Sequence, residues 1–350
     1  MSIVDSTYQW LVLGAGPAGI AVVGNLLENG IEPSEIAWVD PFFQSGDFGR
    51  LWGEVSGNTK MCDFLNYFNA LDTFRNLIQR EHFAVFDRSP DSTCLLGEVA
   101  EPLTWLTEQL KSKVKAYTGW VEQIENQGFA NVITMKDGTS IAANKIVLCT
   151  GANPKYLDFP KAPARIDLET ALSSTKLAAA VNCNDRVAVF GSSHSAIIII
   201  RKLHELGVKR IDNFYRNALR FAVPMEGWTL YDNTGLKADT ARWAMDTLCH
   251  NCPEHMVRHV SNEQNIQQYL PKCDKVIYAT GFERRSPSFT NVETDQYDGF
   301  TGIIAPGVFG AGLAYPLKAT TPFGDSELDI GLWKFMKGIQ KVLPIWLKYP

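Results

Sequence analysis

Long apolar runs are absent from the 350-residue sequence. None is longer than Ala196–Ile200, which is far shorter than the roughly 20 residues that a membrane-spanning helix needs. The first residues also lack the basic start, apolar stretch and small-residue cleavage site of a secretory signal. We therefore expect no integral membrane segment and a cytoplasmic protein.

An excess of positive charge is absent as well. The formal net charge is −5, and no long run of one sign occurs. General affinity for nucleic acid needs a basic face that displaces counterions from phosphates, so we expect no nucleic-acid partner. The length allows two domains at roughly 100–200 residues per domain.

Paired cysteines at regular spacing are missing too. The chain has seven cysteines, an odd number that does not suit a secreted disulfide scaffold and is typical of a reducing compartment. Cys249 and Cys252 form a C-x-x-C, followed by His255 and His259. Three interpretations stay open: half-buried thiols with surface histidines, a redox dithiol, or a metal site. The gap from Cys252 to His255 is too short for an ordinary zinc finger, so we predict no metal.

The sequence does contain one order of elements twice. In the first copy, the apolar strand Trp10–Leu13 leads into a glycine-rich turn, a helix to Glu28 and a second strand, Ile36–Val39. In the second copy, the strand Val187–Phe190, a turn and a helix to Leu206 precede the strand Ile211–Tyr215. Each copy later has a short apolar strand followed by Thr-Gly, at Thr150-Gly151 and at Thr280-Gly281. This duplication predicts an α/β protein with two Rossmann-like dinucleotide-binding domains.

The first turn has the G-x-G-x-x-G spacing at Gly14, Gly16 and Gly19, with Pro17 and Ala18 between the last two. These glycines permit a tight turn, close approach of a pyrophosphate, and close packing of helix on strand. The N-terminus of the helix binds the phosphate charge. Asp40, at the end of the next strand, is the acid expected to bind ribose hydroxyls.

The second turn keeps Gly191 but has Ser193 and Ala196 in place of the other glycines. Small side chains still leave room for a phosphate. Arg216 stands at the end of the following strand, where a charged guanidinium accommodates the 2′-phosphate of NADP. The second turn therefore favours NADPH over NADH.

Other segments have weaker signals. We expect a long functional loop over Pro41–Phe68, a helix over Pro102–Lys113, and paired strands at Trp120–Ile124 and Val132–Met135. An amphipathic helix is expected over Ile330–Leu347. The aromatic residues of one region fit either a hydrophobic core or the mouth of an active site: Trp52, Phe64, Tyr67, Phe68 and Phe74.

Together these residues resemble the two-dinucleotide-binding-domain flavoproteins of the pyridine nucleotide–disulfide oxidoreductase superfamily. The most similar branch is that of the flavin-dependent monooxygenases and the lysine and ornithine N-hydroxylases. Gly49-Arg50-Leu51-Trp52 resembles their Gly-Gly-x-Trp segment, and Asn58-Thr59-Lys60-Met61 resembles the Asn-Thr stretch beside the flavin. Pro306–Gly312 resembles the late strand that lies along the flavin.

The resemblance implies an NAD(P)H-binding domain, residues 161–279, inserted in a discontinuous FAD-binding domain, residues 1–160 and 280–350. It implies FAD and NADPH as cofactors and Asn58, Thr59 and Lys60 as neighbours of the flavin. Beyond the residues of the two turns, it implies further cofactor contacts at Trp52, Met61, Val121, Thr150, Gly151, Gly281, Gly310 and Gly312.

The function implied is an FAD-dependent oxidoreductase that accepts hydride from NADPH and is monooxygenase-like or a reductase of a small molecule. The chain departs from the monooxygenase pattern at Lys161 and Arg165, which replace Gly and His, and at Leu313, which replaces a late acid. Two alternatives therefore stay open: an NADPH-dependent disulfide oxidoreductase using Cys249 and Cys252, and a non-catalytic nucleotide-binding scaffold. A homo-oligomer is possible with any of the three.

Overall fold

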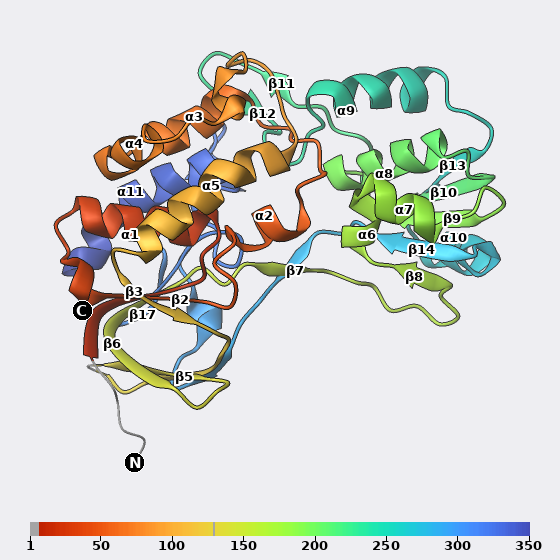
Figure 1. The fold of residues 1–350 in the computed structure, drawn as a ribbon. Helices are drawn as coiled ribbons and strands as arrows, with labels where there is room; N and C mark the ends of the chain where they lie inside the picture. The colour runs from red at the N-terminus through yellow and green to blue at the C-terminus, as the bar shows by residue number, and fades with distance from the viewer. Residues whose placement is uncertain (1–6, 129) are drawn as a thin grey trace. The chain divides into compact units, whose positions relative to one another are not determined.

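The computed structural model describes residues 7–128 and 130–350, and it divides the chain into two compact units (Figure 1). The first unit comprises Met1–Gly53, Thr59–Ala152 and Arg284–Pro350, and the second comprises Glu54–Asn58 and Asn153–Glu283. The resemblance implies boundaries at residues 160 and 280, whereas the chain passes from one unit to the other between Ala152 and Asn153 and between Glu283 and Arg284. The short segment Glu54–Asn58, which groups with the second unit, was not part of that expectation.

The described part of the first unit is built on a nine-stranded mixed sheet. Strand β1 pairs in parallel with β2 and β6, β2 pairs with β3, and β18 pairs with β6, while β4, β5 and β6 form an antiparallel extension. The strands are β1 (Thr7–Leu13), β2 (Ile36–Asp40), β3 (Lys115–Thr118), β4 (Val121–Asn126), β5 (Asn131–Met135), β6 (Ser140–Leu148), β16 (Ser288–Thr290), β17 (Ile303–Ala305) and β18 (Val308–Gly310).

Helices cover one face of this sheet, as Figure 1 shows for α1, α5 and α11. The alternation of side chains along β1 explains the two faces: Trp10 and Val12 pack toward these helices, whereas Leu11 and Leu13 pack into a second cluster with β4, β5 and β6. The helices are α1 (Pro17–Glu28), α2 (Gly46–Leu51), α3 (Met61–Asn69), α4 (Asp72–Ile78), α5 (Leu96–Lys111) and α11 (Leu332–Lys348), with short 3₁₀ turns η1 (Pro33–Glu35), η2 (Ala84–Asp87) and η5 (Thr294–Gln296). A small hairpin, β19 (Lys318–Thr320) with β20 (Ser326–Leu328), precedes α11.

The expected loop over Pro41–Phe68 is wrong in part, because α2 and most of α3 lie within it. Met61, Phe64 and Phe68 recur at helical spacing and are buried, but the Gly and Asn residues before them concealed that period. The aromatic residues of this region form core: Phe64, Tyr67, Phe68 and Phe74 are each at most 2% exposed. Helix α5 likewise begins at Leu96, six residues before the expected start at Pro102, which lies inside it.

The second unit contains a five-stranded parallel sheet in the order β13-β10-β9-β14-β8 among its described residues. Its first strand in the repeated pattern, β9, lies between β10 and β14, as in a doubly wound fold. The strands are β8 (Ala164–Ile166), β9 (Arg186–Phe190), β10 (Arg210–Tyr215), β13 (Met256–Val260) and β14 (Lys275–Tyr278).

The remaining elements of the second unit are mostly short. They are the helices α6 (Leu168–Leu172), α7 (Ser174–Ala180), α8 (His194–Glu205), α9 (Ala238–Trp243) and α10 (Glu263–Tyr269), the π-helix η3 (Ala244–His250), the 3₁₀ turn η4 (Leu270–Lys272) and the hairpin β11 (Val223–Pro224) with β12 (Thr229–Leu230). The two segments where the chain crosses between units pair as β7 (Ala152–Pro154) and β15 (Phe282–Arg284).

None of the helices in residues 7–128 and 130–350 is long and apolar enough to span a membrane.

Candidate functional site

The first glycine turn joins the carboxyl end of β1 to α1. Gly14 has φ +108°, and a Cβ there would lie 2.3 Å from the carbonyl oxygen of Cys149. A Cβ on Gly19 would lie 1.9 Å from the carbonyl oxygen of Gly14, so the helix can approach the strand only because both positions are glycine. Gly16 precedes α1, which begins at Pro17, and the free N–H groups of the first helical turn point to this end of the sheet. This arrangement fits a bound pyrophosphate.

Asp40 lies beside this turn, at the end of β2. Its Oδ2 accepts a hydrogen bond from the backbone N–H of Ala15 at 2.7 Å, and its Oδ1 accepts from Phe42 and Phe43 at 2.8 and 2.7 Å. A carboxylate has about four lone-pair sites, so three backbone donors leave capacity for a ribose hydroxyl. The geometry holds the predicted acid at the turn, and its contact with ribose stays a prediction.

Two charged residues that the sequence did not reveal surround the end of β6. Arg285 donates to Asp47 Oδ2 at 2.7 Å, and its backbone N–H donates to Gly151 at 3.1 Å. Thr150 Oγ1 donates to the carbonyl of Arg285 at 2.5 Å. Asp47 follows Gly46, where a Cβ would lie 2.7 Å from Gly16 Cα, so α2 begins directly against the glycine turn. The first Thr-Gly pair is therefore held next to the turn by an ion pair whose partners are 238 positions apart.

The late glycines reach the same place. Gly312 has φ +78°, and a Cβ there would lie 2.6 Å from the Cβ of Ala18 in α1. A Cβ on Gly310, the last residue of β18, would lie 2.4 Å from the ring of Tyr315. The structure thus brings the late strand to the first glycine turn, and its contact with the flavin stays a prediction. Val121 lies elsewhere in the sheet, where it opens β4 opposite Met135.

The second glycine turn repeats this geometry between β9 and α8. Gly191 has φ +127°, and a Cβ there would lie 2.4 Å from the carbonyl oxygen of Ala279. Ala196 is buried and would lie 3.1 Å from that Cβ, so a methyl group fits where the first turn requires Gly19. Ser193 precedes α8 and is exposed. Gly281 has φ +95° and follows Thr280, whose Oγ1 donates to Lys155 at 2.6 Å.

Asn213 supports the second turn from the neighbouring strand β10. Its Nδ2 donates to the carbonyl oxygens of Val189 and Gly191 at 3.0 and 2.7 Å, and its Oδ1 accepts from Arg258 Nε at 3.0 Å. The Arg258 guanidinium also lies 4.5 Å above the ring of Tyr215. Sequence reasoning missed this residue, since an Asn inside an apolar strand has no local signal for its partners.

Arg216 directly follows β10 and is exposed. It therefore stands at the carboxyl edge of the second sheet, one strand away from the Gly191 turn.

Comparison with known proteins agrees with this duplicated geometry. The family model described as pyridine nucleotide-disulphide oxidoreductase matches residues 8–218, which include both glycine turns. The chain belongs to this family. A monooxygenase of Paecilomyces divaricatus, AgnR1, is 34% identical, and the alignment covers 96% of this chain and 97% of that protein.

Solved structures of the same architecture include L-lysine 6-monooxygenase from Pseudomonas syringae, with a TM-score of 0.65 and 13% identity. A flavin-containing monooxygenase from Stenotrophomonas maltophilia has a TM-score of 0.63 and 12% identity. Each alignment covers 97% of this chain and 99% of the other. At such low identity these similarities show the fold alone, and that fold is the predicted pair of Rossmann-like domains. Membership of the family shows that the chain is an oxidoreductase.

The three residues predicted to lie beside the flavin do not all belong to the same unit. Asn58 groups with the second unit, whereas Thr59 and Lys60 belong to the first. Lys60 forms an exposed ion pair with Asp91 at 2.7 Å, which raises the pKa of the lysine. Met61 is buried at the start of α3, and Trp52, just after α2, is partly exposed. Their roles at the cofactor stay predictions.

The cysteine–histidine segment does not form one cluster. Cys249 and Cys252 are free and exposed residues, but partial burial of its sulfur raises the pKa of Cys252. The disulfide oxidoreductase alternative is less favoured, because the relative that is 34% identical over 96% of this chain is a monooxygenase. The interpretation of His259 as a surface histidine is wrong, because the residue is buried and its Nε2 lies 2.7 Å from Asp212 Oδ1. Its ring lies against those of Phe214 and Tyr269. Among the described residues, no group of three His, Cys, Asp or Glu side chains can hold a metal ion.

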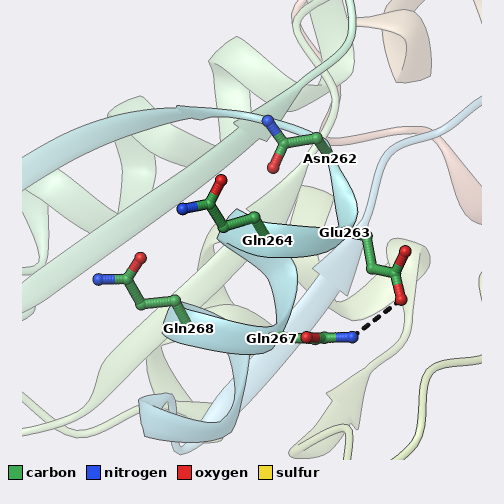
Figure 2. A pocket seen from close by; sticks show the side chains of 5 residues that line it. All are labelled: Asn262, Glu263, Gln264, Gln267 and Gln268. Atoms are coloured by element: carbon green, nitrogen blue, oxygen red, sulfur yellow. Dashed lines mark hydrogen bonds between the residues drawn. The ribbon is translucent and has the colours of Figure 1, made fainter.

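A polar hollow lies where β13 leads into α10 (Figure 2). It is lined by Asn262, Glu263, Gln264, Gln267 and Gln268. Gln267 donates to Glu263 at 2.9 Å, as the dashed line shows. The backbone N–H of Ser261 donates to Tyr215 at 2.8 Å, so the hollow and Arg216 follow the carboxyl ends of two paired strands.

Proposed function

We propose that this protein is an FAD-dependent monooxygenase that takes hydride from NADPH and acts on a small molecule. The observation that carries the proposal is the presence of two glycine turns in one chain, each between a strand that has parallel neighbours on both sides and a 12-residue helix. In each turn a Cβ on the first glycine would overlap a carbonyl oxygen of a distant strand end. The monooxygenase of Paecilomyces divaricatus that is 34% identical over nearly the whole chain supports oxygenation as the activity.

The first unit would hold FAD. The N-terminus of α1 faces the turn and would bind the pyrophosphate, while Asp40 would accept hydrogen bonds from the ribose. Gly310 and Gly312 would leave room for the flavin along the late strand. When bound, FAD would supply the two-electron chemistry between nicotinamide and oxygen, while the chain binds, orients and excludes water.

The second unit would hold NADPH. The N-terminus of α8 would bind the pyrophosphate at the Gly191 turn, and Arg216 would pair with the 2′-phosphate. The amide-lined hollow at α10 follows the strand next to β10 and would flank the adenosine end of the nucleotide. With both cofactors supplying the redox chemistry, no nucleophilic side chain is required for hydride transfer.

The nucleotide preference tests this assignment. Replacing Arg216 by alanine removes a charged partner of the 2′-phosphate, so the ratio of kcat/KM for NADPH over NADH should fall at least about tenfold. Arg242→Ala removes an exposed guanidinium from α9 and should leave the ratio unchanged. Steady-state oxidation of each nucleotide measures the ratio. An unchanged ratio in Arg216→Ala would overturn the role of this arginine.

A further inference from the structure

The segment Glu54–Asn58, between α2 and α3, is attached to the second unit at its first residue. Glu54 accepts hydrogen bonds from Ser173 Oγ at 2.9 Å and from the backbone N–H of Ser174 at 3.0 Å. These donors form the N-terminus of α7, where a carboxylate is stabilised by unpaired N–H groups. The serine donors lower the pKa of Glu54, so the carboxylate stays charged near neutral pH.

A second attachment lies two residues further along. The ring of His194, the first residue of α8, places Nε2 3.2 Å from the carbonyl oxygen of Ser56. A carbonyl oxygen only accepts, so Nε2 carries the hydrogen in this contact. Burial lowers the pKa of His194, which favours the neutral ring with one N–H donor. No donor among the described residues reaches the buried Nδ1.

His194 lies at the start of α8, next to the proposed nucleotide-binding turn. It directly follows Ser193 in the Gly191 turn, the turn assigned above to the NADPH pyrophosphate. Its partner Ser56 lies two residues before Asn58, a predicted neighbour of the flavin. One side chain therefore joins the nucleotide-binding turn to the segment that places Asn58.

We infer that His194 is a positioning residue whose Nε2–H holds the segment Glu54–Asn58 against the nucleotide-binding turn. The role of His194 in hydride transfer rests on the proposed function, but its hydrogen bond to Ser56 can be tested without nucleotide. Its role is to keep Asn58 in one place while hydride is transferred. Loss of the contact should therefore slow flavin reduction more than it weakens nucleotide binding.

Hydrogen–deuterium exchange on the FAD-loaded protein tests the contact directly. In His194→Ala, peptides that cover residues 54–58 should exchange about threefold to tenfold faster than in the wild type, as expected for loss of one hydrogen bond. His194→Gln, whose amide can still donate, should exchange within about twofold of the wild type. His250→Ala, at an exposed histidine of η3, is the matched control, and a thermal melt of each variant verifies folding.

Stopped-flow mixing with NADPH then separates binding from positioning. In His194→Ala the limiting rate of flavin reduction should fall at least about tenfold, the Kd for NADPH should stay within about threefold, and glutamine should restore the rate. Unchanged exchange at residues 54–58 in His194→Ala, or equal loss in the alanine and glutamine variants, would overturn the inference. A wild-type protein that binds no NADPH would instead overturn the proposed function, because the exchange result is obtained without nucleotide.

Discussion

The carboxylate of Asp40 accepts a hydrogen bond from the backbone N–H of Ala15 at 2.7 Å, although the two residues are 25 positions apart. This bond fastens the end of β2 to the first glycine turn, while the other carboxylate oxygen holds the backbone of Phe42 and Phe43. One side chain therefore shapes both the turn and the chain that leaves the strand.

Replacing Asp40 by alanine should weaken FAD binding and the fold together. Three backbone N–H groups would lose a charged acceptor, and leaving buried donors unpaired costs about 1–3 kcal/mol each before relaxation. We expect a loss of about 3 kcal/mol in the free energy of unfolding and at least about a tenfold weaker FAD affinity, measured by urea unfolding and by titration of the apoprotein. Asp137→Ala, at an exposed hairpin turn, should change the free energy of unfolding and the FAD affinity by only a small fraction of these amounts.

Asn213 should control nucleotide binding without affecting the flavin. Alanine at this position removes two hydrogen bonds to the backbone of Val189 and Gly191 and leaves Arg258 without its acceptor. The Kd for NADP⁺ should rise about tenfold, while the FAD content of the purified protein stays as in the wild type. Calorimetric titration measures the Kd, and Asn184→Ala is an exposed control. An Asn213→Ala protein that binds NADP⁺ normally would contradict this role.

Lys145 should stabilise the docked C-terminal helix. Its Nζ donates to the carbonyl oxygens of Trp346, Leu347 and Tyr349 at 2.7, 3.1 and 2.6 Å, and so satisfies the end of α11. Lys145→Met keeps the apolar stem but removes these donors, so the free energy of unfolding should fall by about 2–3 kcal/mol. Lys341→Met changes an exposed lysine of the same helix. Equal unfolding midpoints in urea for the two variants would refute this account of α11.

Stability should depend on pH through the His204–His255 pair. The two rings share a 3.0 Å hydrogen bond, and burial, His204 and Arg210 lower the pKa of His255 below the ordinary value of 6.5. Between pH 6.5 and the lowered pKa, His255 is mostly protonated in the unfolded chain and mostly neutral in the folded chain. The contribution of the pair is therefore complete above about pH 6.5 and is lost as the pH falls through the lowered pKa.

Unfolding curves between pH 7.5 and about 5 measure this loss. His255→Gln cannot take up the proton, so its stability should fall less on acidification than that of the wild type. His250→Gln replaces an exposed histidine and should keep the wild-type slope. A His255→Gln protein with the full wild-type loss would show that the pair does not contribute.

Local patterns predicted the features that are themselves local. The glycine spacing at Gly14–Gly19, the acid at Asp40 and the repeat at Gly191 each depend on residues within one βαβ unit, and the structure places them at the ends of adjacent strands. The expected loop over Pro41–Phe68 is wrong in part, because the glycines and asparagines of that segment hid helices that tertiary packing stabilises.

Long-range pairing was not predictable from one sequence. The partners Asp47 and Arg285 are 238 positions apart, and neither stands in a pattern that names the other. The same holds for His194 and Ser56, which are 138 positions apart, and for the buried His259 with Asp212. Each of these contacts lies within one unit and joins segments that are distant in the sequence, so it becomes visible only when the chain is folded.

The absorbance spectrum of the purified protein, recorded anaerobically before and after NADPH and then in air, tests the central claim most directly. The account predicts a yellow protein with an oxidised flavin spectrum that bleaches on NADPH addition and recovers in air. A flavin that stays oxidised in the presence of NADPH, or a colourless protein that cannot be loaded with FAD, would contradict it.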